Sequence, residues 1–311
     1  MLGLLQIVAP VFLIVGAGYV ATRTGAFRHS AVDGLIAFTQ NFAIPCLLFR
    51  AIAQLDISHV FNPGLLISFY AGATICFVLG VIGARTIFRR RPGEAVAIGF
   101  SALFSNTVLL GLPIMERAYG AGALPGNYAI VALHAPFCFL LGISFMEFAR
   151  TDGRGLLGTV RGVVAAMFRN ALMIGILLGF IANIGDIRLP GTVNASIDMM
   201  IRAALPAALF GLGGVLTRYR IRASLGEAAM TSTLSLMVHP AIALLLATQV
   251  FAVSQDFVRS AVVTAAMAPG VNAFVFASMY DRAKGIAATT VLLSTAISIL
   301  TVTFWLGVLG R

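Results

Sequence analysis

The feature that most constrains this chain is a series of apolar runs, each as long as a helix that crosses a membrane. A helix needs about 20 residues to cross a hydrocarbon layer roughly 30 Å thick. Ten such spans can be drawn, at 2–21, 32–53, 64–84, 94–115, 127–149, 170–187, 193–216, 229–251, 259–280 and 286–309. The pattern predicts an all-α integral membrane protein with ten transmembrane helices.

The composition excludes a water-soluble domain. Of the 311 residues, 59% are hydrophobic and 10% are charged, too few to cover an apolar core in water. The net charge of +10 could suggest nucleic acid, but the basic residues form short clusters between apolar runs, so the expected partner is the lipid bilayer. Three cysteines lie inside apolar spans without metal-ligand spacing, and neither a metal nor a cofactor is expected.

Basic residues are unevenly distributed between the connections. Those after the five odd-numbered spans hold fifteen Lys and Arg residues, and those after spans two, four, six and eight hold three. Since Lys and Arg gather in cytoplasmic loops, we expect the odd-numbered connections inside and both termini outside. The first span has no basic flank before it, so we expect it to be retained and not cleaved as a signal.

The two halves of the chain match each other at nearly constant offsets. Residues 32–49 align with 193–210 at an offset of 161, and Glu116-Arg117-Ala118-Tyr119-Gly120 aligns with Asp281-Arg282-Ala283-Lys284-Gly285 at an offset of 165. Five spans per half would invert the second half, which is a transporter architecture. The sequence therefore predicts repeats at 1–149 and 170–311, joined by a basic cytoplasmic connection at 150–169.

Two apolar spans carry helix breakers beside an asparagine, where lipid tolerates neither without support. The fourth holds Asn106, Thr107, Gly111 and Pro113, and the ninth holds Pro269, Gly270 and Asn272. Unwound backbone at bilayer depth is tolerated only where protein or a water-filled cavity satisfies it, so such segments mark solute pathways. We expect both helices to be broken and to meet near the midplane.

The two asparagines allow two interpretations. Their amides could re-satisfy the backbone groups freed by each break. Alternatively, the half-helix N-termini could present N–H groups to a carboxylate while Asn106 and Asn272 orient it. Both roles can coexist, and we favour the second.

Further polar or kinking residues lie in other spans. Pro45 and Pro206, at matched positions of spans two and seven, could line the cavity or simply bend their helices. Asn41 could cap a freed carbonyl or face the cavity. Asp198 and Arg202, four residues apart, could form an ion pair, or Arg202 could attract an anionic substrate. His134 could contact a solute or be a buried, hydrogen-bonded residue.

Enzyme signatures are absent from the sequence. It contains no His-Glu-x-x-His, no Gly-x-Ser-x-Gly and no phosphate-cradling loop, so an enzyme is not expected. The acids of spans four and nine lie only at the span ends, which disfavours ion coupling by a carboxylate at the midplane.

Three motifs resemble the auxin efflux carrier family. Ser105-Asn106-Thr107 with the following Gly111-Leu112-Pro113 resembles the family's fourth-helix motif, Ala43-Ile-Pro45-Cys-Leu-Leu-Phe49 the second-helix motif, and Ala273-Phe-Val-Phe-Ala-Ser-Met-Tyr280 part of the ninth. The resemblance implies two inverted five-helix repeats, whose fourth and ninth helices cross in a fold like that of sodium/proton antiporters. It also implies that Asn106 contacts a substrate carboxylate, and that His134, where plant-type members have Gln, is a second contact.

The chain departs from the plant-type pattern in two ways. Ala268 and Ala273 stand where plant members have prolines, and the short 150–169 connection replaces their long hydrophilic loop. This suits a compact permease of a bacterial inner membrane that moves small organic anions, mono- or dicarboxylates such as malonate. A sodium-coupled symporter of the bile-acid type is the nearest alternative, and a channel or a membrane sensor is more distant. Whether the protein is a monomer or a homodimer stays open.

Overall fold

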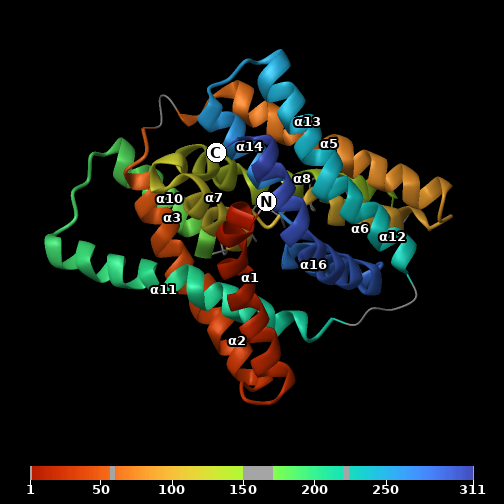
Figure 1. Ribbon diagram of the computed structural model, residues 1–311, viewed down its shortest axis with the longest axis horizontal. Helices are drawn as coiled ribbons and strands as arrows, with labels where there is room; N and C mark the ends of the chain where they lie inside the picture. Colours follow the sequence, from red (N-terminus) through yellow and green to blue (C-terminus); the bar gives the residue numbers. More distant parts are fainter. Residues whose placement is uncertain (1, 57–59, 150–170, 220–223, 311) are drawn as a thin grey trace. The chain divides into compact units, whose positions relative to one another are not determined.

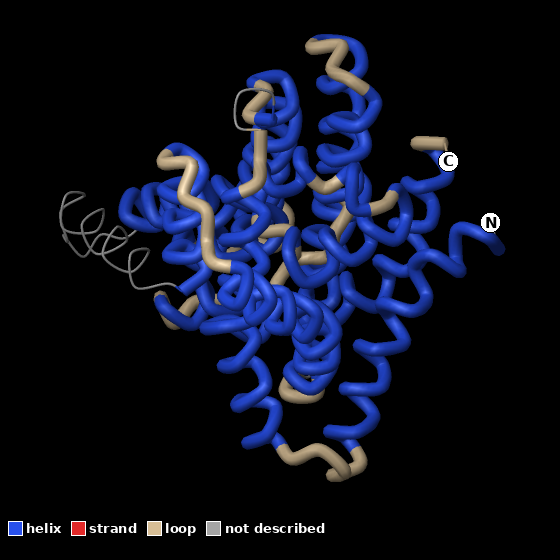
Figure 2. The backbone as a smooth tube through the Cα atoms, turned by 90° about the vertical axis from the view of Figure 1, so that its left-hand side faces the viewer, coloured by secondary structure: helices blue, strands red, loops and turns tan. Residues whose placement is uncertain are grey.

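The computed structural model describes residues 2–56, 60–149, 171–219 and 224–310, and this part of the chain is helical. Figure 2 shows helices joined by loops, and the described residues form no strand beyond one isolated bridge between Ser105 and Pro269. The all-α prediction is confirmed. The predicted connection at 150–169 lies outside the described residues.

The helices group into two compact units. The helices of unit 1 come from residues 61–149 and 224–310, and those of unit 2 come from residues 10–53 and 171–216 (Figure 1). Each unit therefore takes helices from both predicted repeats. The two units describe how the helices pack, and the two repeats stay a prediction from the sequence.

Unit 1 contains both interrupted apolar segments. Its helices are α5 (Pro63–Thr86), α6 (Pro92–Leu103), α7 (Leu112–Tyr119), α8 (Pro125–Ala149), α12 (Leu225–Thr233), α13 (His239–Leu245), α14 (Gln255–Ala265), α15 (Val271–Met279) and α16 (Lys284–Val308). Short helical turns join some of them: η2 (Thr107–Gly111), η3 (Ala121–Ala123), η4 (Leu234–Val238) and η5 (Leu246–Val250). In its core, the rings of Phe100 and Phe276 stack with centroids 3.9 Å apart, which joins α6 to α15.

The described part of unit 2 contains five helices, with α1 included from Pro10 onward, and one π turn. They are α1 (Leu2–Arg23), α2 (His29–Phe38), η1 (Thr39–Ala43), α3 (Ile44–Ala53), α10 (Ala171–Ile184) and α11 (Gly191–Leu216). α10 packs along α3, and α11 packs across α2 and α3. The α1–α11 contact depends on a glycine, because a Cβ on Gly213 would clash with the Val15 carbonyl oxygen.

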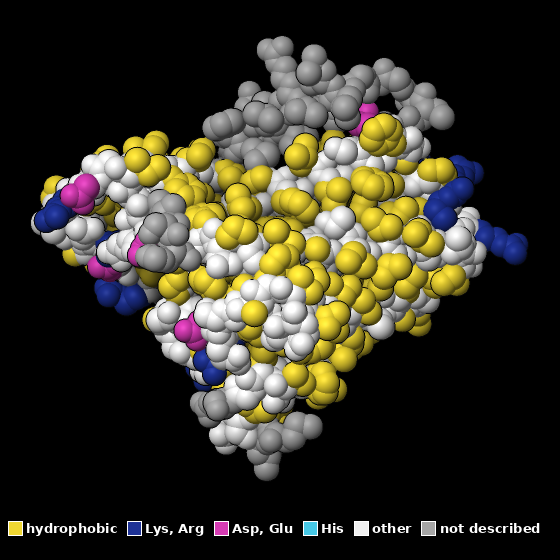
Figure 3. Space-filling model, turned by 90° about the horizontal axis from the view of Figure 1, so that it is seen from above, with side chains coloured by type: hydrophobic (Ala, Val, Ile, Leu, Met, Phe, Trp, Pro, Cys, Tyr) yellow, Lys and Arg dark blue, Asp and Glu magenta, His cyan; other side chains and the backbone are white. Residues whose placement is uncertain are grey.

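Seven helical segments of the described chain are long and apolar enough to cross a membrane by length and composition. They correspond to predicted spans one, two, three, five, seven, eight and ten. Spans four and nine are the interrupted pairs α6/α7 and α14/α15, and span six is the 14-residue α10. The face seen in Figure 3 is covered largely by hydrophobic side chains, as expected of a surface in contact with lipid.

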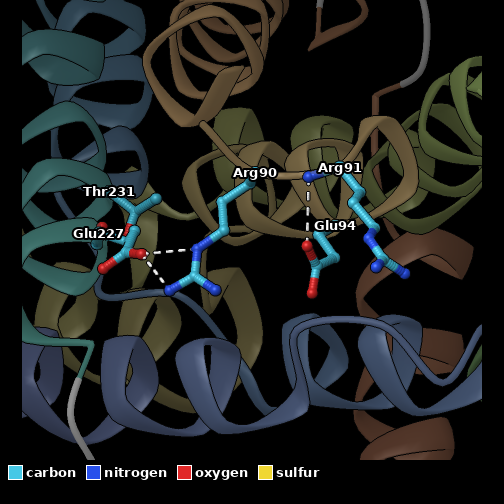
Figure 4. Close-up of polar contacts among 5 residues, drawn as sticks. All are labelled: Arg90, Arg91, Glu94, Glu227 and Thr231. Carbon is cyan, nitrogen blue, oxygen red and sulfur yellow. Dashed lines mark hydrogen bonds and ion pairs between the residues drawn. The ribbon is translucent and has the colours of Figure 1, made fainter. Parts of the chain in front are cut away.

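A partly buried ion pair joins the α5–α6 connection to α12 in unit 1 (Figure 4). Arg90 Nε and Nη2 donate to Glu227 Oε1 at 2.8 and 2.5 Å, and only 6% of the Glu227 side chain is exposed. On the next residue, the Arg91 backbone N–H donates to Glu94 Oε2 at 3.2 Å, which caps the start of α6. The start of α6 is therefore held by a side-chain ion pair on Arg90 and by a capped backbone N–H on Arg91.

Candidate functional site

The fourth span is interrupted as its sequence predicts. α6 ends at Leu103, Phe104 to Asn106 leave the helical conformation, and the chain re-enters a helix through the π turn η2. Asn106 is the residue before this turn, and its Oδ1 accepts a hydrogen bond from the Leu109 N–H at 3.2 Å. The interruption is therefore capped by the side chain that the sequence marked.

The ninth span is interrupted in the same way. α14 ends at Ala265, and α15 begins at Val271 after a non-helical stretch that contains Pro269 and Gly270. Gly270 precedes α15 and no side-chain hydrogen bond caps this helix, so its first N–H groups stay available.

The two interruptions cross and satisfy each other's backbone. The Asn106 N–H donates to the Ala268 carbonyl at 2.8 Å, and the Gly270 N–H donates to the Phe104 carbonyl at 3.0 Å. Ser105 and Pro269 face each other between these two bonds as an isolated antiparallel bridge. Unwound backbone in an apolar layer needs such partners, and here each broken helix supplies them to the other.

His134 supports the crossing from α8. Its Nε2 lies 3.1 Å from the Ser105 carbonyl oxygen, which can only accept, so the imidazole N–H donates to the crossing backbone. His134 is 2% exposed, as expected for a buried, hydrogen-bonded histidine. It reaches the crossing through the main chain of Ser105.

Several polar groups at the crossing have no partner among the described residues. They are the Asn106 Nδ2 group, the side-chain amide of the half-buried Asn272, and the buried Ser105 Oγ. Gly270 packs beside Asn106, since a Cβ on this glycine would lie 3.6 Å from the asparagine's Cα and Cβ. Thr107 and Gly111, at the two ends of η2, are buried next to Asn106, and Pro113 follows in the first turn of α7.

The electrostatics of the crossing favour an anion. The interrupted segments 103–112 and 265–273 contain no Asp or Glu. The free groups include amide N–H donors, and the uncapped N-terminus of α15 adds a partial positive charge. A carboxylate could accept from all of them.

One pair of polar residues behind the crossing was missed by the sequence reasoning. Asn127 of α8 donates from Nδ2 to Thr264 Oγ1 of α14 at 2.7 Å, just before the ninth span breaks. The Asn127 Oδ1 is buried without a partner. The available signal was an asparagine in the fifth apolar span, but this residue stands at the first position of that span.

Five other candidate residues lie in unit 2. Asn41 is exposed in the turn η1, Pro45 is the second residue of α3 directly after this turn, and Pro206 lies inside the continuous helix α11. The predicted ion pair between Asp198 and Arg202 is wrong. Asp198 Oδ1 lies 3.0 Å from Arg50 Nη1, while the Arg202 side chain is exposed and forms no ion pair with the described residues.

Interrupted, crossing helices in an apolar all-helical chain are typical of membrane transporters. The comparisons agree, because residues 4–306 match the family described as "Membrane transport protein". The chain belongs to this membrane transport family, the auxin efflux carrier family. It is accordingly a transporter and not an enzyme.

Three relatives cover almost the whole chain. The "Putative malonate transporter" of Rhizobium meliloti (strain 1021) is 23% identical, over 96% of this chain and 93% of the relative. An "Uncharacterized transporter" of Methanothermobacter thermautotrophicus is 23% identical, over 98% of both chains. The "Probable auxin efflux carrier component 5c" of Oryza sativa subsp. japonica is 22% identical, over 97% of this chain and 96% of the relative.

Proposed function

We propose that this transporter moves small organic anions by alternating access and that it binds their carboxylate at the helix crossing. The observation that carries the proposal is the set of unpaired donors there, on Asn106, Asn272 and the uncapped start of α15, with no acid in either interrupted segment. A carboxylate would complete these hydrogen bonds and neutralise the partial charge. A dicarboxylate such as malonate is the leading substrate, and the printed name of the Rhizobium relative supports it.

The proposed membrane arrangement follows from the sequence. Ten spans form two inverted five-helix repeats, 1–149 and 170–311, in a bacterial inner membrane with both termini outside. The interrupted spans then run in opposite directions, so that both breaks reach the midplane. Inverted repeats with matched breaks are typical of transporters that work by alternating access.

The substrate site is tested by flux of radiolabelled malonate into proteoliposomes. Asn106→Ala removes both the amide donors and the cap of η2, whereas Asn106→Ser keeps a hydroxyl that can cap the turn. Losing a hydrogen bond to a charged group should raise the half-saturation concentration by about 10- to 100-fold in both variants. Unchanged saturation in Asn106→Ser would remove this residue from the site.

A matched control uses another amide of unit 1. Gln249 is exposed in η5, and the one bond of its side chain to a described residue is with the neighbouring Thr248, so Gln249→Ala should leave malonate flux unchanged. The same vesicles distinguish the alternatives. Uptake that follows an imposed sodium gradient would favour a sodium-coupled symporter, and flux that does not saturate would favour a channel.

A further inference from the structure

A pocket of about 410 Å³ lies within unit 2, away from the interrupted helices in the sequence. It forms where α3 and α10 end and where α11 begins, and its wall contains two arginines, one aspartate and several amide side chains beside apolar ones. The chain's transport function gives this pocket no role. Its charged wall and its place at helix ends call for a ligand of defined chemistry.

The wall of the pocket is held in place before any ligand arrives. Arg50 Nη2 donates to the Asn194 carbonyl oxygen and Oδ1 at 3.2 and 3.0 Å, and Arg50 Nη1 lies 3.0 Å from Asp198 Oδ1. Asn183 Nδ2 lies 2.7–3.1 Å from three carbonyls at the end of α3. The Arg50 Nε–H has no partner among the described residues, so it stays available to a ligand.

The rim carries both signs of charge in a weak, exposed pair. Arg188 Nη2 lies 3.7 Å from Asp186 Oδ2, and 88% and 86% of these side chains are exposed. Such a pair contributes little by itself, so both groups can turn to a ligand. The N-terminus of α11, which no side chain caps, opens between the pocket residues Leu189 and Asn194 and adds partial positive charge.

An exposed apolar stripe on α10 leads to this pocket. Ile174, Leu177, Leu178, Ile181 and Ile184 are exposed at spacings of three and four residues along one helix face. Ten residues of helix rise about 15 Å, which is half of a 30 Å hydrocarbon layer and so the thickness of one leaflet. The last turn of this helix, with Ala182 and Asn183, is itself part of the pocket wall.

We propose that the pocket binds one phospholipid with a zwitterionic headgroup that carries a primary ammonium. The phosphate lies against Arg50 and Arg188, the ammonium lies against Asp186, and an acyl chain follows the stripe on α10. A simple anion would leave Asp186 facing a like charge, and a second protein copy would not explain a stripe one leaflet long that ends at charges of both signs.

Native mass spectrometry of the full chain tests the proposal. The protein is released from micelles that contain equimolar phosphatidylethanolamine and phosphatidylglycerol. Wild type should retain one phosphatidylethanolamine. Arg188→Gln should lower this retention about five-fold, the effect of one basic residue beside a lipid headgroup. Asp186→Asn should lower retention of phosphatidylethanolamine but not of phosphatidylglycerol; Asp186 has φ +44°, a conformation that Asn tolerates.

The matched control is Arg23→Gln, which removes one exposed arginine from unit 2 at the end of α1. Its lipid retention should equal that of wild type. Equal loss in the Arg23 and Arg188 variants would overturn the site, and stronger phosphatidylglycerol binding in Asp186→Asn without loss of phosphatidylethanolamine would overturn the zwitterion. Light scattering that shows Arg188→Gln dissociating a dimer, with lipid retention unchanged, would assign the surface to a second copy instead.

Discussion

At the scale of single residues, the two roles open to Asn106 fall on different atoms of one side chain. Its Oδ1 caps the turn that follows the break, and its Nδ2 has no partner among the described residues. The amide thus stabilises the interruption and still offers donors to a ligand. No such bond joins the Asn272 side chain to another described residue, so both polar atoms of its amide are available.

Substitution of Asn272 tests the sign of the charge that the crossing accepts. Asn272→Asp keeps the size of the side chain and places a carboxylate beside the proposed substrate carboxylate. Like charges across a contact cost several kcal/mol, so the half-saturation concentration for malonate should rise by more than about 30-fold. Asn272→Ala, which removes the donors without adding charge, should raise it less, and saturation measured in proteoliposomes that ranks the variants the other way would contradict an anion site.

The same scale shows where sequence reasoning fails. The position of Asn106 and Asn272 at the interruptions could be predicted, because an amide beside a helix breaker is conspicuous in an apolar span. The partner of Asp198 could not, because helical spacing points to Arg202, while the actual partner, Arg50, lies on another helix. Spacing along one helix indicates which residues could be neighbours, but the packing of helices determines which residues form contacts.

At the scale of the helices, close packing in unit 1 depends on small residues where α5 and α6 meet. A Cβ on Gly99 would lie 2.6 Å from Val81 Cγ2 and 2.8 Å from the Phe77 carbonyl oxygen. The carbonyl belongs to the backbone of α5 and cannot rotate away. α6 therefore approaches α5 closely just before its interruption.

Gly99→Ala should destabilise the protein by about 1–3 kcal/mol, the usual range for overpacking, and lower the apparent melting temperature in detergent by a few degrees. The matched control is Gly16→Ala in α1, since a Cβ there meets nothing within 4 Å. This change should leave the melting temperature equal or slightly higher, because Ala favours the helix. Equal melting of both variants would show that the α5–α6 contact can relax.

The ion pair of Arg90 and Glu227 also acts between elements. Glu227→Ala would leave Arg90 without its partner in a half-buried place, and we expect a loss of about 1–3 kcal/mol. Asp281→Asn removes the exposed pair with Lys284, whose side chains are 86% and 48% exposed, and should destabilise the protein much less, because water screens this pair. Thermal unfolding in detergent compares the two, and an equal effect would mean that burial adds nothing to the Arg90 pair.

At the scale of the whole molecule, the two units are groups of helices that pack together, whereas the two repeats are predicted from the sequence. Each unit draws helices from both halves of the sequence, and both interrupted helices lie in unit 1.

The proposed topology places Asp186 outside and Lys284 inside. In intact cells, a membrane-impermeant thiol reagent should label Asp186→Cys, whereas Lys284→Cys should react only after permeabilisation; the reverse pattern would overturn the orientation.

The sequence by itself determined the membrane class, the approximate helix limits and the two interruptions, because apolar length, proline, glycine and isolated asparagines act locally and leave a local pattern. Only the tertiary structure decided that Phe104 and Gly270 pair across the crossing, that His134 donates to its backbone, and that Arg50 holds Asp198. These contacts join residues far apart in the chain. They depend on how helices pack, and no local pattern of residues encodes that packing.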